Sequence, residues 1–223
     1  MAVKIIVAIT IILVILLSGH TLLYSMIVSI FSIPEGPGLL ALKIFFGVLG
    51  FSFVIASVIS SQDNGIFTRA FYRVSAVWLG LFFYLLLATL IYHVLLFPVF
   101  GLSALTLAVS GKILLSLAIG VTLYGTIHAT DIRVTRITVP LPHLPETWKS
   151  RRAVWASDFH LGQVRGSSFA RLVTKSIQKL NPDIVFIGGD LYDGVKVDAN
   201  TIIQPLKELR APLGVYFITG NHE

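Results

Sequence analysis

Polar side chains that can bind metal or phosphate gather in three short blocks of the C-terminal third of the chain. The first block holds Asp158 and His160, the second holds Asp190, and the third holds Asn221 and His222. Taken singly, an Asp after a strand is more often a turn former or a helix cap. Carboxylates, imidazoles and an amide together are ligands that suit Mn²⁺, Fe or Zn²⁺. The three blocks therefore predict a metal or phosphate site, provided that the fold brings them together.

The segments between the blocks indicate how they are positioned. Short apolar runs at 153–156, 184–187 and 215–218, typical of buried strands, each precede one block. Apolar residues at helical spacing predict a helix over 167–180, capped by Ser167 or Ser168, and a second helix that begins after Asp198. The order β-α-β-α-β predicts a parallel sheet buried on both faces. All three blocks then lie at its carboxyl edge, where α/β sheets bind ligands.

The blocks resemble the signature of the calcineurin-like metallophosphoesterases, which reads D-x-H, then G-D-x-x-D, then G-N-H-[DE]. Here the matching segments are 157–162 (SDFHLG), 189–193 (GDLYD) and 220–223 (GNHE). The resemblance covers about residues 150–223, and the Leu-Pro lead-in is similar to the membrane-attached bacterial branch of the family. It implies the first half, β-α-β-α-β, of a four-layer αββα sandwich.

The resemblance also implies a role for each residue. Asp158 and His160 would bind the first of two divalent metal ions (Mn, Fe or Zn), Asp190 would bridge the two ions, and Asn221 would bind the second. A bridging hydroxide would attack the phosphate, and His222 would contact the phosphate and protonate the leaving group. Asp193 would orient its neighbours, as carboxylates around metal sites do.

Three further histidines complete the family's site, and no histidine follows His222 in this sequence. We therefore expect a C-terminally truncated domain, and a polypeptide that by itself is inactive or nearly so. A second reading is a non-catalytic membrane protein that carries a relic of the phosphoesterase domain. A third, a small transporter, is weakened because the spans contain no buried carboxylate.

The N-terminal half of the chain has a composition suited to lipid. The 223 residues are 55% hydrophobic and 13% charged, and only seven charged side chains lie within residues 1–127. Spanning helices need about 20 apolar residues, and four stretches qualify: about Ile5–Phe31, Leu39–Ser61, Val74–Phe97 and Leu105–Ile127. The absence of cysteine excludes disulfides and thiolate metal sites. The net charge of +6 reflects basic residues that flank the apolar stretches, so no nucleic-acid partner is expected.

Basic residues predict the orientation of the spans. They lie before the first span, in the second loop at Arg69 and Arg73, and after the fourth span, whereas the first and third loops have none. The positive-inside rule then places both termini and the phosphoesterase domain in the cytoplasm of a multi-pass cell-membrane protein. Lys43 and Lys112 would reach the interface from within their spans, or else serve a function there.

The remaining features complete the predicted organisation. Residues 1–127 form the transmembrane region, 128–150 a linker with an edge strand over Ile132–Val139, and 151–223 the phosphoesterase segment. His20 and His93 are expected to form interhelical hydrogen bonds rather than bind metal. The resemblance implies a phosphorylated substrate; the nearby bilayer favours a lipid-linked phosphate, with a soluble nucleotide or phosphodiester as the alternative.

Overall fold

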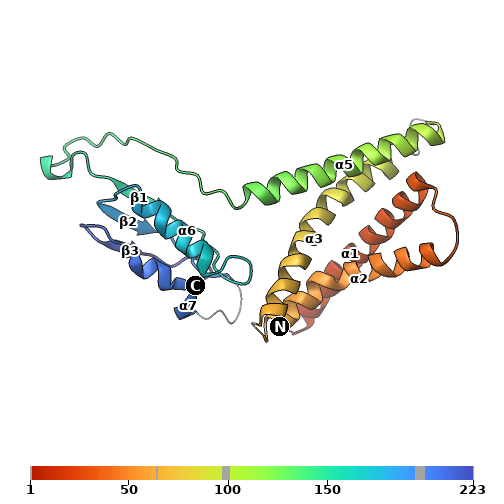
Figure 1. The fold of residues 1–223 in the computed structure, drawn as a ribbon, viewed down its shortest axis with the longest axis horizontal. Helices are drawn as coiled ribbons and strands as arrows, with labels where there is room; N and C mark the ends of the chain where they lie inside the picture. Colours follow the sequence, from red (N-terminus) through yellow and green to blue (C-terminus); the bar gives the residue numbers. More distant parts are fainter. Residues whose placement is uncertain (1, 64, 97–100, 194–198, 223) are drawn as a thin grey trace. The chain divides into compact units, whose positions relative to one another are not determined.

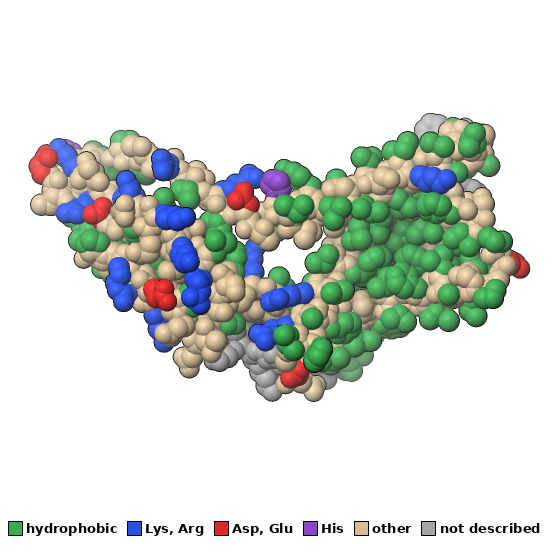
Figure 2. All heavy atoms as spheres, in the orientation of Figure 1, with side chains coloured by type: hydrophobic (Ala, Val, Ile, Leu, Met, Phe, Trp, Pro, Cys, Tyr) green, Lys and Arg blue, Asp and Glu red, His purple; other side chains and the backbone are tan. Residues whose placement is uncertain are grey.

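Four long apolar segments form helices in the computed structural model, which describes residues 2–63, 65–96, 101–193 and 199–222. They are α1 (Ala2–Phe31), α2 (Pro37–Ser60), α3 (Ile66–Leu90), which runs on into the π-helix η1 (Ile91–Leu96), and α5 (Ala104–His128) (Figure 1). All four are long and apolar enough to cross a membrane. Many apolar side chains on these helices are exposed (Figure 2), as expected for surfaces that face lipid.

The third helix begins eight residues earlier than predicted, at Ile66 rather than Val74. Arg69 and Arg73, predicted as loop residues, therefore lie within its first turns. The Asp63 carboxylate accepts hydrogen bonds from the Gly65 N–H and the Thr68 hydroxyl, and so ties down the start of the helix. The prediction was wrong because hydropathy marks where apolar residues begin, whereas a helix continues through charged residues. The predicted end at Phe97 lies outside the described residues.

Hydrogen bonds between side chains join the helices of this N-terminal, apolar part of the chain. The Trp78 indole N–H donates to His20 Nε2 over 3.1 Å, and the opposite ring nitrogen of His20 lies 2.7 Å from the Leu16 carbonyl. His93 Nε2 lies 3.1 Å from the Ser25 hydroxyl. Both histidines therefore form interhelical hydrogen bonds, as predicted. Hydrogen bonds of this kind substitute for the hydrophobic effect, which is weak between helices in lipid.

The C-terminal unit is built on three parallel strands, β1 (Ala153–Ala156), β2 (Ile184–Ile187) and β3 (Val215–Phe217), in the order β1-β2-β3. Helix α6 (Ser167–Gln178), the short helix α7 (Ala199–Ile203) and the 3₁₀ helix η3 (Gln204–Glu208) connect them. The predicted β-α-β-α-β order is confirmed. The core of the unit lies between α6 and the sheet. Leu161 and Val185 are fully buried there, in one cluster with the buried Ala170 and Ile177 of α6.

Some local predictions for this unit were wrong. Ile132–Val139 forms no strand: among the described residues the sheet consists of β1, β2 and β3 alone, and Ile132 packs against the core of the unit by its side chain. Gly166, not Ser167 or Ser168, is the N-cap of α6. The predicted second helix splits into α7 and η3 at Pro205, which has no N–H for a helical hydrogen bond. Asp198, its predicted cap, lies outside the described residues.

The sheet is covered on one face only within the described residues. The other face carries a row of aromatic rings, with Phe186 between Trp155 and Tyr216 at ring separations of 6.3 and 5.8 Å. Trp155 is 62% exposed and Tyr216 is 52% exposed. The expectation of burial on both faces was wrong for this chain, because its helices pack on one side of the strands (Figure 1).

The amino edge of the sheet is held by Asp183, opposite the predicted site. Its carboxylate accepts hydrogen bonds from the Arg152 N–H at 2.8 Å and the Arg151 guanidinium at 2.6 Å. These two interactions, in that order, hold the pKa of Asp183 below its usual value. The Asp183 carbonyl also accepts from the Leu213 N–H, which joins the approach to β3 to the same edge.

Candidate metal centre

The loops that leave β1 and β2 remain paired beyond the ends of the strands. The Asp158 N–H donates to the Gly189 carbonyl at 3.2 Å, and the His160 N–H donates to the Asp190 carbonyl at 3.0 Å. The Leu161 and Asp193 N–H groups extend the pairing at 2.8 and 2.9 Å. Hydrogen bonding of the backbone thus places the Asp-x-His block directly beside Asp190.

The backbone of this region is strained at the residues that carry the chemistry. Asp158, His160 and Asp190 have φ angles of 57°, 46° and 49°, in the left-handed region that costs a non-glycine residue about 1 kcal/mol or more. Strain of this kind persists only where surrounding contacts enforce it, and it clusters at functional sites. The paired loops and the buried Leu161 side chain supply those contacts.

The third block approaches Asp190 closely because Gly220 has no side chain. A Cβ at Gly220 would lie 2.1 Å from Asp190 Oδ1 and 2.6 Å from the Asp190 nitrogen. Two residues later, the His222 N–H donates to Asp190 Oδ1 over 3.2 Å. Gly220 therefore brings the loop after β3 against the loop after β2.

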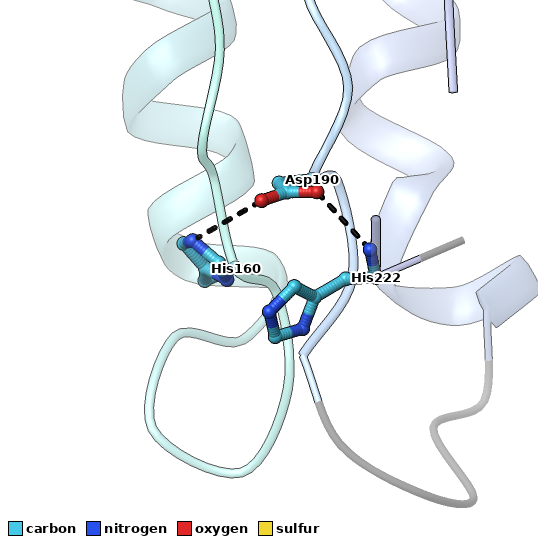
Figure 3. A group of neighbouring side chains, drawn as sticks. All are labelled: His160, Asp190 and His222. Atoms are coloured by element: carbon cyan, nitrogen blue, oxygen red, sulfur yellow. Dashed lines mark hydrogen bonds and ion pairs between the residues drawn. The ribbon is translucent and has the colours of Figure 1, made fainter. Parts of the chain in front are cut away.

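His160, Asp190 and His222 form a group that could hold a metal ion (Figure 3). Each offers one ligand atom, and these atoms lie within 4.8 Å of one another. His160 Nε2 is 4.0 Å from Asp190 Oδ2, and the two imidazole rings lie 4.9 Å apart and nearly perpendicular. Metal–ligand bonds of about 2.0–2.2 Å put neighbouring ligand atoms of one ion roughly 3–4 Å apart, so the three side chains would have to close in by up to about 1 Å to share a divalent ion.

Two more carboxylates border this group, which is called the histidine–aspartate group below. Asp158 Oδ1 lies 4.0 Å from His160 Nε2, and Asp193 Oδ1 lies 3.6 Å from His222 Nδ1. The Asp158 side chain is 65% exposed, whereas that of Asp190 is 15% exposed. Asp190 is therefore the most enclosed carboxylate of the site, and it is the one that contacts both other blocks.

The structure thus assembles five of the six residues that the sequence singled out. Asn221 precedes His222 and is exposed, and its role as a ligand stays a prediction. Sequence reasoning assigned His222 to proton transfer, while the structure also places its imidazole among the candidate ligands. Sequence reasoning missed that Gly220 allows the loop after β3 to approach Asp190, because only the distance between the two residues reveals it. The Gly-Asn-His motif was the one signal in the sequence that pointed to this loop.

Comparison with known proteins agrees with this chemistry. The family model "Calcineurin-like phosphoesterase" matches residues 151–223, the whole of the segment that carries the histidine–aspartate group. No solved structure matches the chain significantly.

The curated relatives include membrane proteins. A transmembrane protein with metallophosphoesterase domain from Danio rerio is 37% identical over 101 residues, 45% of this chain and 23% of the relative. Its counterpart in Bos taurus is 40% identical over 90 residues, 40% of this chain and 20% of the relative. The UDP-2,3-diacylglucosamine pyrophosphatase LpxG of Chlamydia trachomatis is 34% identical over 93 residues, 41% of this chain and 28% of the relative.

The matched part of the chain spans 20–28% of the length of these relatives. The four long apolar helices of the whole chain, together with relatives that are named as transmembrane proteins, support a membrane protein. In its C-terminal segment, residues 151–223, the chain carries a calcineurin-like metallophosphoesterase domain.

Proposed function

We propose that this chain is the membrane-anchored, metal-binding portion of a metal-dependent phosphoester hydrolase. The observation that carries the proposal is the convergence of His160, Asp190 and His222 at the carboxyl edge of the sheet. Charge supports it as well, because Asp158, Asp190 and Asp193 gather around two imidazoles and so favour a cation.

The proposed roles combine the resemblance with the contacts among these residues, and the role of Asn221 rests on the resemblance alone. Asp158, His160 and Asp190 would hold a first ion, and Asp190 and Asn221 would hold a second. Divalent ions in such a site neutralise phosphate charge and lower the pKa of bound water. His222 donates a proton to the leaving oxygen, and Asp193, 3.6 Å from its Nδ1, holds the imidazole in orientation.

The ligand set within residues 151–223 is smaller than the resemblance implies for two ions. We therefore propose that the 223-residue polypeptide binds metal weakly and hydrolyses phosphoesters slowly or not at all. The whole protein's substrate is proposed to be a phosphate or diphosphate attached to a lipid, presented at the bilayer on the cytoplasmic side. One relative's name, a pyrophosphatase of a diacylated sugar nucleotide, supports that substrate class.

Metal binding gives the sharpest test. In detergent, Mn²⁺ titration by calorimetry should show binding to the wild type and a loss of 10-fold or more in affinity for Asp190→Asn. Asp183→Asn is the matched control, because it removes a carboxylate from the opposite edge of the sheet. Equal affinity in Asp190→Asn and the wild type would remove the basis of the proposal.

Activity is tested separately with bis(p-nitrophenyl) phosphate and Mn²⁺. The 223-residue chain should give a rate near that of the buffer. A rate typical of phosphatases that is lost in His222→Ala would show that the chain is catalytically sufficient, which contradicts the proposed weak activity and supports the assigned role of His222.

A further inference from the structure

The outer side of the helical layer in the C-terminal unit carries five exposed cations. They are Arg171 and Lys175 of α6, Lys179 at its C-cap, Lys207 of η3 and Arg210, two residues after the end of η3. Figure 2 shows Lys and Arg side chains gathered on the side of the unit that presents α6 and α7. These five residues are called the basic face.

The basic face is one continuous surface because η3 lies along α6. The Thr174 hydroxyl donates to the Pro205 carbonyl at 3.2 Å, and the Gln178 side-chain amide donates to the Arg210 carbonyl at 2.9 Å. Arg171, Lys175 and Lys179 recur at every fourth position of α6 or its C-cap, so they form a stripe about 12 Å long. Arg210 bonds the Lys207 carbonyl, which keeps those two residues together beside the stripe.

Charge on this face is not neutralised locally. Among the residues that the structure describes, none of the five cations forms an ion pair. Glu208 is the single acidic residue of α6, α7 and η3. The helix dipole favours Lys175 and Lys179 near the end of α6, but it gives no reason for Arg171, Lys207 or Arg210.

A bilayer fits the basic face better than a nucleic acid does. Leu172 is 48% exposed beside the stripe, so an apolar side chain that could enter the headgroup region stands next to the cations. Single-stranded nucleic acid would need aromatic platforms beside the cations, and the exposed Trp155 and Tyr216 rings lie on the sheet face away from α6. The same chain carries four helices that are long and apolar enough to cross a membrane, so a bilayer is a partner within reach of its own tether.

The connecting segment allows such a contact. Residues 131–145 contain no helix or strand, so they can extend by up to about 3.3 Å per residue. That length lets the C-terminal unit turn its helical layer toward a bilayer surface. We propose that the basic face binds the anionic headgroups of the membrane in which the chain is anchored. This interaction is separate from the metal chemistry proposed above.

The test uses the full chain in vesicles, and the lack of native cysteine makes labelling specific. Ser168→Cys, exposed on the same side of α6, carries a donor fluorophore from a membrane-impermeant maleimide, and headgroup-linked acceptors report its distance from the bilayer. Vesicles contain either phosphatidylcholine alone or phosphatidylcholine with 30% phosphatidylglycerol. Energy transfer should be higher with phosphatidylglycerol and should fall as salt rises from 50 to 500 mM.

Charge-neutralised variants make the test specific. Arg171→Gln, Lys175→Gln and Lys179→Gln together should weaken the lipid contact about 100-fold, at roughly fivefold per cation. The matched control neutralises three cations outside the basic face, through Arg133→Gln, Arg136→Gln and Lys149→Gln, and should keep the wild-type difference between lipids. Equal transfer in both lipids, equal loss in the two triple variants, or release of the contact by an RNA oligomer at equal phosphate concentration would each overturn the proposal.

Discussion

Gly220→Ala tests the geometry of the candidate metal centre most directly. The new Cβ would lie 2.6 Å from the Asp190 nitrogen and 2.1 Å from its Oδ1, whereas ordinary contacts begin at 3.4 Å. The backbone between the two loops must therefore open by about 0.8 Å, and the carboxylate by more, while metal ligands tolerate only about 0.2 Å. We expect Mn²⁺ affinity to fall 10- to 100-fold.

The same substitution should destabilise the unit by about 1–3 kcal/mol, the usual cost of overpacking. Circular dichroism melts and Mn²⁺ calorimetry, performed in one detergent, separate loss of fold from loss of metal. Gly166→Ala is the matched control, since nothing lies within 4 Å of its Cβ and it stands at the N-cap of α6. It should cost at most about 1 kcal/mol and leave Mn²⁺ affinity unchanged. Unaltered Mn²⁺ affinity in a folded Gly220→Ala variant would refute the close approach of the two loops.

Three further outcomes are expected. The pKa of Asp183 is lowered from 3.8 in the folded unit, so the ionised carboxylate stabilises the fold fully above pH 3.8, and this contribution is lost as the pH falls through the lowered pKa. In thermal melts between pH 2 and 7, the melting temperature of Asp183→Asn should therefore fall less steeply toward low pH than that of the wild type. Trp78→Phe removes the indole N–H that donates to His20 and should destabilise the helical unit by about 0.6–1.7 kcal/mol in detergent unfolding. An unchanged unfolding midpoint would mean that this hydrogen bond contributes little to stability. Gly111→Ala would place a Cβ 2.5 Å from Ile30 and should cost about 1–3 kcal/mol, whereas Gly120→Ala, with open space around it, should be neutral or stabilising in the same unfolding assay.

The bounds of the strands were predictable because their signals are local. The runs 153–156 and 184–187 match β1 and β2 residue for residue, and β3 ends one residue before the predicted Ile218. Short apolar runs between turn residues have few alternatives within a parallel sheet. Helix ends were harder to predict, because the start of α3 depends on hydrogen bonds to Asp63 rather than on hydropathy.

The sequence by itself predicted the residue types of the candidate site and the four apolar spans. Residue types, spacing and strand order suffice to predict that Asp158, His160, Asp190 and His222 share one edge of a sheet. Long apolar stretches likewise indicate spans without any knowledge of packing.

Only the tertiary structure decided the distances within the site and which surfaces remain free. His222 meets Asp190 because Gly220 permits two loops, 30 residues apart in sequence, to touch. The basic face exists as one surface because η3 packs beside α6, which no local pattern encodes. The exposed aromatic row is also a tertiary result, since strand periodicity defines two faces but not which of them a helix will cover. Local patterns specify elements, whereas contacts between distant segments, made by backbone hydrogen bonds and close packing, specify the site.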